Sequence, residues 1–257
     1  MPEFVLYNAP QSTCSQRVRF VLAAKGLEFE EHRLDLFAGD QLKPDYLKLN
    51  PNGVVPTLVH DGKVIIDSSV IAEYLDELFP DPERFVPEDA AARAQMRSLM
   101  RFIDEVPTPA IRIPSYNLAF LRYFRTMSEE EFLALAESKP LRKEFLLRMG
   151  RTGFPKEEME AALDRLSRAL KRMTEAISAS GGPWLLGGML TLADIAVMPV
   201  IVRMADIGLA HMWDGMPAID TWLAAIRAHP AYAKAYYHGA LLTEKYPELK
   251  DEIKGRR

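Results

Sequence analysis

The alternation of short apolar runs with Gly, Pro and Asp breaks predicts a small α/β unit over the first 80 residues. The predicted strands cover residues 4–7, 27–36, 57–60 and 63–66. The last two strands flank Asp61-Gly62, which favours a tight hairpin turn because both residue types tolerate positive φ angles. Helical patterns cover residues 12–25, 41–49 and 68–79.

The pattern changes after the proline-rich stretch 79–83, where apolar residues recur with a helical period and no strand is convincing. The predicted helices cover residues 88–104, 128–138, 141–149, 156–179, 192–207, 218–228 and 230–236, with 250–257 frayed. The chain therefore divides into an α/β domain over 1–80, a linker over 81–88 and an all-α domain over 89–257.

Composition narrows the choice of partners. The chain has 257 residues, 48% of them apolar, which is enough for a sizeable core. Its formal net charge of −4 argues against general nucleic-acid binding. Cys14 is the single cysteine and the five histidines lack metal-ligand spacing, so we expect neither a disulfide nor a metal site. No signal peptide or membrane-spanning run is visible, so we expect a soluble, cytoplasmic protein without a membrane partner.

Hydroxyls and a thiol cluster at residues 12–15, where the first strand passes into the first helix. The free amides and dipole at a helix N-terminus stabilise anions, including a thiolate. Ser12 and Cys14 are therefore candidate catalytic residues. The alternative is that Ser12 only caps the helix and Cys14 only fills a small buried space.

Two further segments suit the binding of a peptide. A cis bond before Pro56 would expose the Val55 backbone to an extended peptide, although the rarity of cis bonds favours Pro56 as an ordinary edge residue. Ser68 and the free helix amides could hold a carboxylate while Asp67 accepts from an ammonium group, or Ser68 could simply cap its helix. Together with the thiol motif, these segments fit a short acidic peptide that carries a thiol.

In this order and spacing the segments resemble the glutathione transferase superfamily over almost the whole chain. The matching stretches are residues 12–18, 50–58, 67–75 and 191–195, the last with the Thr191/Asp194 spacing of a helix capping box. The resemblance implies a thioredoxin-like glutathione-binding domain followed by an all-α domain. It also implies glutathione as the co-substrate, a hydrophobic electrophile as the second substrate and a homodimer.

The resemblance also implies a role for each matched residue. Ser12 corresponds to the serine that hydrogen-bonds the glutathione sulfur, and Val55, before cis-Pro56, to the residue that pairs with the cysteinyl backbone. Ser68 would take the γ-glutamyl carboxylate, with Asp67 near its amino group. Many members carry Lys or Gln two residues before the cis-proline, where this chain has Val54, so the glycyl end of glutathione must be bound by other residues.

Two branches of the superfamily compete. Residues 12–19 are similar to the zeta class, which includes maleylacetoacetate isomerases and a tetrachlorohydroquinone dehalogenase, and Cys14 matches the cysteine that the dehalogenase uses in thiol–disulfide exchange. Residues 92–105, 127–132 and 153–158 resemble bacterial glutathione-dependent β-aryl etherases. We therefore prefer an ether-cleaving transferase acting on an aromatic electrophile. The alternatives are a dehalogenase, thiol reductase or isomerase acting through Cys14, and a non-catalytic binding protein of the same fold.

A pocket for the second substrate is expected just beyond residue 110. An apolar pocket with few polar groups suits an aromatic substrate. The candidate pocket residues are Ile111, Arg112, Tyr116, Asn117 and Phe120. The alternative is that they pack helices, because an aromatic stripe at helical spacing is often part of a core.

Overall fold

A four-stranded sheet forms the N-terminal part of the computed structural model, which describes residues 3–254. The strand order is β2-β1-β3-β4, with β1 and β2 parallel and the other two pairs antiparallel. The strands are β1 (Phe4–Asn8), β2 (Glu30–Arg33), β3 (Thr57–His60) and β4 (Lys63–Ile66). The hairpin turns at Asp61 and Gly62, whose φ angles are 49° and 76°. The expected strand over 27–36 is shorter than predicted.

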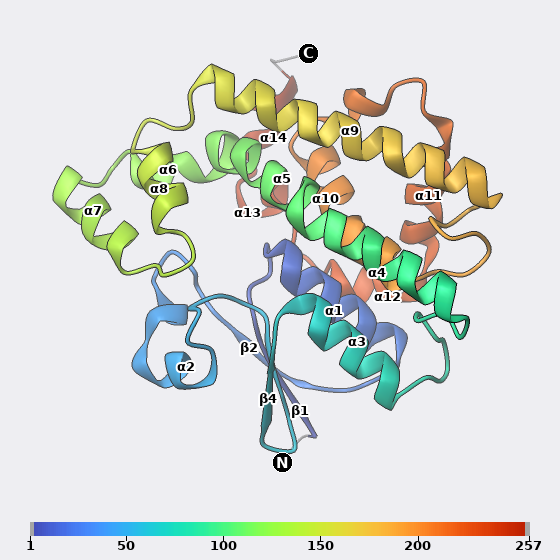
Figure 1. Cartoon of the computed structure of the whole chain (residues 1–257). Helices are drawn as coiled ribbons and strands as arrows, with labels where there is room; N and C mark the ends of the chain where they lie inside the picture. The colour runs from blue at the N-terminus through green and yellow to red at the C-terminus, as the bar shows by residue number, and fades with distance from the viewer. Residues whose placement is uncertain (1–2, 255–257) are drawn as a thin grey trace.

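Helices α1 (Thr13–Ala24) and α3 (Ser68–Leu78) lie on one side of the sheet, next to the helical region, and α2 (Pro44–Leu49) lies on the other side (Figure 1). The predicted helix over 41–49 is divided, because the backbone of Lys43 is extended between the short turn η1 (Asp40–Leu42) and Pro44. A parallel pair, a hairpin and three helices make this the thioredoxin-like arrangement that the sequence predicted.

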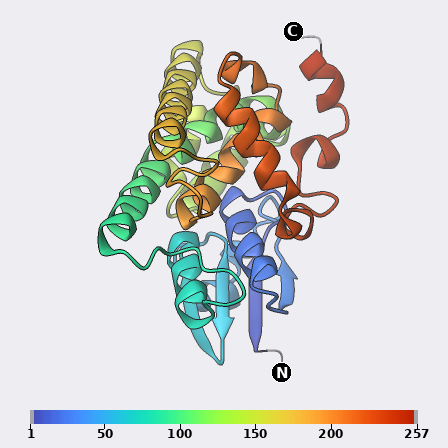
Figure 2. The same cartoon turned by 90° about the vertical axis from the view of Figure 1, so that its right-hand side faces the viewer.

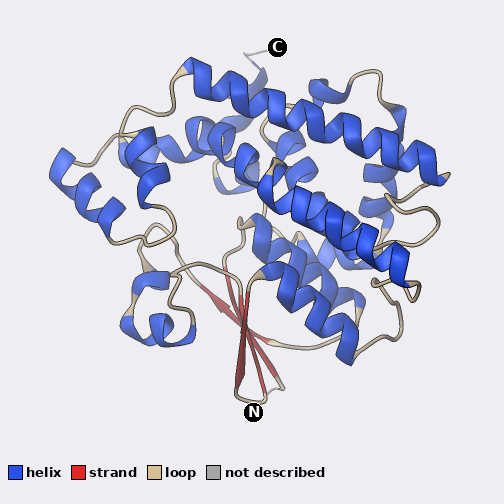
Figure 3. Cartoon of the chain, in the orientation of Figure 1, coloured by secondary structure: helices blue, strands red, loops and turns tan. Residues whose placement is uncertain are grey.

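The remainder of the described chain is helical (Figure 3). Its longer helices are α4 (Ala90–Glu105), α7 (Glu129–Glu137), α8 (Lys143–Met149), α9 (Lys156–Ser180), α10 (Leu192–Asp206), α11 (Pro217–Ala228) and α12 (Pro230–Ala235). Helix α10 is buried over Leu192–Met204 and packs against α1, α4 and α5. The view in Figure 2 shows the helical region stacked on the sheet part of the molecule. Between residues 3 and 254, no helix is both long and apolar enough to cross a membrane. The division at residues 80 and 88 stays a prediction.

Several helical segments were not predicted. Residues 107–124 form α5 (Pro107–Ser115), the π-helical turn η2 (Tyr116–Phe120) and α6 (Leu121–Phe124), although three prolines lie in α5. The short turn η3 (Ala210–Trp213) lies between α10 and α11. Near the C-terminus are α13 (Leu242–Lys245) and α14 (Leu249–Lys254). The prediction that residues 250–257 are frayed is therefore wrong up to Lys254, and 255–257 lie outside the described residues. Ile253 packs so closely on Gly208 that a Cβ there would lie 2.5 Å from Ile253 Cγ2.

The buried carboxylate of Asp194 ties the start of α10 to two other segments. One oxygen accepts hydrogen bonds from the amide and hydroxyl of Thr191, at 3.0 and 2.9 Å. The other accepts from the Leu185 amide and from Trp222 Nε1, both at 2.9 Å. Burial raises the pKa of this carboxyl, and the four donated hydrogen bonds oppose that rise. The predicted Thr191/Asp194 capping box is therefore present, and it also anchors α11.

We predict that Asp194→Ala lowers the free energy of unfolding by about 3 kcal/mol, because it leaves the buried Trp222 and Leu185 donors without acceptors. Chemical denaturation measures the effect. The control is Asp214→Ala at an exposed carboxylate, expected to change stability by less than about 0.5 kcal/mol. Equal stabilities of the two variants would contradict the role given to Asp194.

Candidate active site

A cavity of about 380 Å³ lies between the sheet part and the helical part of the molecule. Its walls come from segments far apart in the sequence. They are residues 9–14 before and within α1, residues 33–37 at and after the end of β2 with Gln41, residues 52–55 before β3, the stretch from α5 to α8, Arg203 of α10 and Lys245 of α13. Such a junction between two structural parts is a common place for a ligand site.

Ser12 and Cys14 both line this cavity at the start of α1. Ser12 is the N-cap of the helix, and its Oγ accepts the Ser15 amide at 3.2 Å. Within residues 3–254 the Ser12 hydroxyl has no acceptor for its own hydrogen, which is therefore available to an anion in the cavity. Cys14 is half-buried and its thiol is free. The expected juxtaposition of a hydroxyl, a thiol and helix-terminal amides is present.

Buried arginines hold the loop that leads to Ser12. Arg19 donates to the carbonyl oxygens of Ala9 at 3.3 Å and Pro10 at 2.9 Å. Arg203 donates to the carbonyl oxygen of Gln11. Burial lowers the pKa of both guanidiniums, but an arginine remains charged at neutral pH. With these carbonyls engaged by cations, the loop and the α1 N-terminus present an environment that favours an anion.

The Val55-Pro56 peptide bond is cis, as the family resemblance implied. Val55 lines the cavity and Pro56 does not. The preceding carbonyl, of Val54, accepts from Tyr46 Oη at 2.5 Å and Asn50 Nδ2 at 3.0 Å. In the described part of the chain, the amide and carbonyl of Val55 itself form no hydrogen bond. They are available to pair with the backbone of an extended peptide.

Asp67 and Ser68 do not line this cavity. Asp67 has a φ of 73° and caps α3 by accepting the Ser69 amide at 2.9 Å. Ser68 is buried, and its hydroxyl accepts from Arg17 at 3.4 Å. Arg17 also pairs with Asp104 at 2.6 Å, and the other Asp104 oxygen accepts from Ser69 Oγ at 2.7 Å. The roles of Asp67 and Ser68 toward glutathione stay predictions.

The helical wall contains four of the five residues expected in the substrate pocket: Ile111, Arg112, Tyr116 and Phe120. Asn117 does not line the cavity. Its side-chain amide donates to the Phe154 carbonyl at 3.0 Å and accepts the Phe154 amide at 2.8 Å, so it holds the α8–α9 loop. Asn117 lies in the π-helical turn η2, which changes the direction of successive side chains relative to an α-helix.

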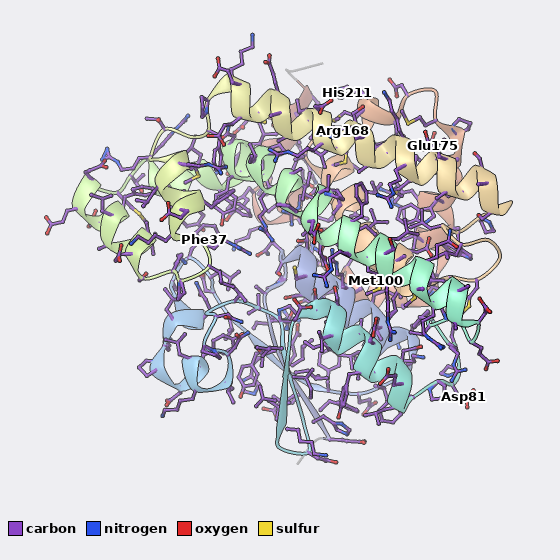
Figure 4. All side chains as sticks on the ribbon, viewed as in Figure 1. Phe37, Asp81, Met100, Arg168, Glu175 and His211 are labelled. Carbon is purple, nitrogen blue, oxygen red and sulfur yellow. The ribbon has the colours of Figure 1, made fainter. Side chains whose placement is uncertain are left out.

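Other lining residues were missed by the sequence analysis. Phe37 stacks on Tyr123 with ring centroids 4.1 Å apart, and Figure 4 shows it between the α2 side of the molecule and the α8 side. Lys139 and Arg142, between α7 and α8, also line the cavity, together with Phe124. The basic residues around position 140 are the sequence feature that could have predicted this part of the cavity wall.

Burial lowers the pKa of Lys139 and raises the pKa of Tyr116, which therefore stays a neutral phenol. Among the described residues, no His, Cys, Asp and Glu side chains gather into a metal-binding group.

Comparison with known proteins identifies the family. The model of the glutathione S-transferase N-terminal domain matches residues 11–78, and that of the glutathione S-transferase C-terminal domain matches residues 156–225. Glutathione S-transferase 1 of Dianthus caryophyllus is 36% identical, over 97% of this chain and 95% of its own. This chain belongs to the glutathione S-transferase family. It is therefore a transferase that uses glutathione as co-substrate, and the non-catalytic alternative is not retained.

Relatives of both expected branches are present. Protein LigF of Sphingobium sp. strain SYK-6 is 30% identical over 90% of this chain and 92% of its own. The crystal structure of the β-etherase LigF from the same strain superposes with a TM-score of 0.82 at 28% identity, over 91% of this chain and 98% of that one. Maleylacetoacetate isomerase of Pseudomonas aeruginosa is 28% identical over 90% of this chain and 94% of its own.

We predict that Arg19→Lys lowers the free energy of unfolding by about 2 kcal/mol and glutathione-dependent turnover about tenfold. A lysine keeps the charge but cannot donate at once to Ala9, Pro10 and Asn8, so the loop before Ser12 loses its fixed position. Denaturation and steady-state kinetics on one preparation measure both effects.

The matched control for this prediction is Arg93→Lys. Arg93 also donates to two backbone carbonyls, those of Pro87 and Glu88, but lies outside the cavity at the start of α4. Arg93→Lys should change the free energy of unfolding by less than about 0.5 kcal/mol and glutathione-dependent turnover by less than about twofold. An Arg19→Lys protein that behaves like this control would contradict the role assigned to Arg19.

Proposed function

We propose that this glutathione transferase cleaves β-aryl ethers of aromatic ketones. The observation that carries the proposal is the cavity itself, because it joins the free Ser12 hydroxyl and Val55 backbone on one wall to an aromatic wall on the other. The similarity to LigF, which extends over most of both chains in sequence and structure, supports this choice among transferase reactions.

In the proposed reaction the glutathione thiolate attacks the carbon that lies between the ketone and the ether oxygen. The new C–S bond forms as the C–O bond breaks, and the electron pair leaves with the oxygen as a phenoxide. The thiol proton is lost before the attack, so no oxidant or reductant is consumed. A phenoxide is a fair leaving group, so a general acid is not required.

The residues of the cavity have distinct tasks in this reaction. The Ser12 hydroxyl donates to the sulfur, which stabilises the thiolate relative to the thiol and lowers the thiol pKa. The Val55 backbone aligns the cysteinyl part of glutathione. Tyr116, Phe120 and Ile111 hold the aromatic ketone against that sulfur, so the reactants meet in a favourable orientation.

We predict that Ser12→Ala lowers kcat/KM for glutathione and 2-phenoxyacetophenone about a hundredfold, because the thiolate loses its hydrogen-bond donor. Phenol release measures the rate. The variant also loses a helix cap, worth about 1 kcal/mol. Asp89→Ala is the matched control, because Asp89 caps α4 through the Ala92 amide at 2.7 Å and lies outside the cavity. It should lose similar stability and keep its activity.

Cys14 supports a second candidate function, a reductase, dehalogenase or isomerase of the zeta type. The free thiol lies in the same cavity as Arg112. Cys14→Ser separates the two functions. An etherase keeps phenol release in this variant, whereas turnover that requires the thiol loses its final step. Phenol release that depends on Cys14 but not on Ser12, or no release by wild-type protein that binds glutathione, would contradict the etherase proposal.

A further inference from the structure

The cavity lining is strongly basic although the chain as a whole is acidic. Six lining residues carry a basic side chain and one, Asp35, carries an acidic side chain, in a chain of net charge −4. Among the described residues, Asp35 forms no ion pair with any of these bases. One of its oxygens accepts the amides of Phe37 at 2.8 Å and Ala38 at 3.1 Å. The positive charge is therefore concentrated in this cavity.

Three of the six bases are held by a carboxylate or by Gln11. Arg33 pairs with Glu31 at 2.8 Å. Arg203 donates to the Gln11 carbonyl, as described above. Lys245 donates to Gln11 Oε1 at 3.4 Å, and its ammonium lies 5.7 Å from the centre of the Phe37 ring. These side chains hold the walls together.

The other three, Arg112, Lys139 and Arg142, have no carboxylate partner within residues 3–254. Lys139 donates to the Leu36 carbonyl at 3.2 Å, on the side of the loop that follows β2. Arg142 donates only to the adjacent Leu141 carbonyl at 3.0 Å. Arg112 has no hydrogen-bond partner at all in the described chain. A guanidinium presents five donors and is costly to bury without an acceptor.

Arg112 and Arg142 act on the same part of the cavity. Burial lowers the pKa of Arg112, and the neighbouring charge of Arg142 lowers it further. Arginine carries a positive charge at neutral pH, so two like charges line one cavity, and no carboxylate of residues 3–254 pairs with either. Arg112 lies one helical turn before Tyr116, and therefore on the aromatic wall rather than on the Val55 wall.

We propose that the second substrate is an organic anion, an aromatic compound whose carboxylate is bound by Arg112 and Arg142 while its ring packs on Tyr116 and Phe120. This inference rests on the proposed function, because it assigns the class of electrophile to the same cavity. Charge-assisted, bidentate contacts to a carboxylate are the interaction for which arginine is best suited. The cations supply specificity, and the aromatic wall supplies the apolar contact.

Binding of two glutathione conjugates tests the proposal without requiring turnover. The probes are S-(4-carboxybenzyl)glutathione and S-(4-carbamoylbenzyl)glutathione, which differ in charge and little in shape, and calorimetry gives their Kd values. Wild-type protein should bind the carboxylate conjugate about tenfold more tightly than the carboxamide. Arg112→Gln and Arg142→Gln should each remove most of this preference. Arg125→Gln, at an exposed arginine just after α6 and outside the cavity, should retain it.

Each other outcome has a defined meaning. No preference in the wild type, or a preference that survives both cavity variants, overturns the proposal. The proposal is also overturned if Arg112→Gln loses as much affinity for unmodified glutathione as for the carboxylate conjugate. Arg112 would then bind glutathione itself rather than the second substrate. Phenol release is assayed on the same preparations with 2-phenoxyacetophenone and with 4-(2-phenoxyacetyl)benzoate, which carries the carboxylate that the inference requires. Absence of release from both ethers beside a clear carboxylate preference refutes ether cleavage alone, and failure to bind either conjugate refutes both.

Discussion

The buried guanidinium of Arg17 is the interaction on which the active site depends. It donates to the Ala196 carbonyl in α10 at 2.9 Å, to Thr108 in α5 at 2.9 Å and to Asp104 in α4 at 2.6 Å. The desolvated charge is stabilised only because all of these acceptors converge on it. Helix α1 is thereby held in one position against the helical region, and so is Ser12 at its N-terminus. Arg19, two residues further along α1, holds the preceding loop from another side of the same helix.

This arrangement gives the cavity a positive electrostatic potential. The loop carbonyls point to cations, the helix amides and the Ser12 hydroxyl point to the cavity, and most charged residues of the lining are basic. Each of these features favours an anion in a partly desolvated space. The proposed reaction contains anions at both stages, because a thiolate enters and a phenoxide leaves. The same field stabilises the nucleophile before attack and the leaving group after it.

Features set by local sequence were predictable, and features set by distant contacts were not. The hairpin at Asp61-Gly62 and the Ser12 cap follow from neighbouring residues, and both are present. No helix was predicted over residues 107–124, where three prolines lie within nine residues. In α5, Pro107 occupies the first turn, where no intrahelical amide bond is lost. Asn117 was expected in the pocket, but Phe154, 37 residues away, engages its side chain.

Two arginines of the cavity, Arg112 and Arg142, also depend on distant contacts. No sequence pattern links Arg112 in α5 to Arg142 before α8. Only the folded chain places both residues in one cavity. The matching segments of the family were recognisable because glutathione binding uses short motifs at turns and helix ends. Selection of the second substrate uses side chains from several helices, and that information is distributed over the chain.

The most direct test of the central claim is the pKa of the glutathione thiol in the bound state. Ultraviolet absorbance of the thiolate, titrated with pH in the enzyme complex, gives this value for the wild type, Ser12→Ala and Cys14→Ser. We expect a pKa well below the usual thiol value of about 8.5 in the wild type and in Cys14→Ser, and a return toward that value in Ser12→Ala. A bound thiol whose pKa is unchanged by the loss of Ser12 would contradict the assignment of Ser12 as the thiolate-stabilising residue.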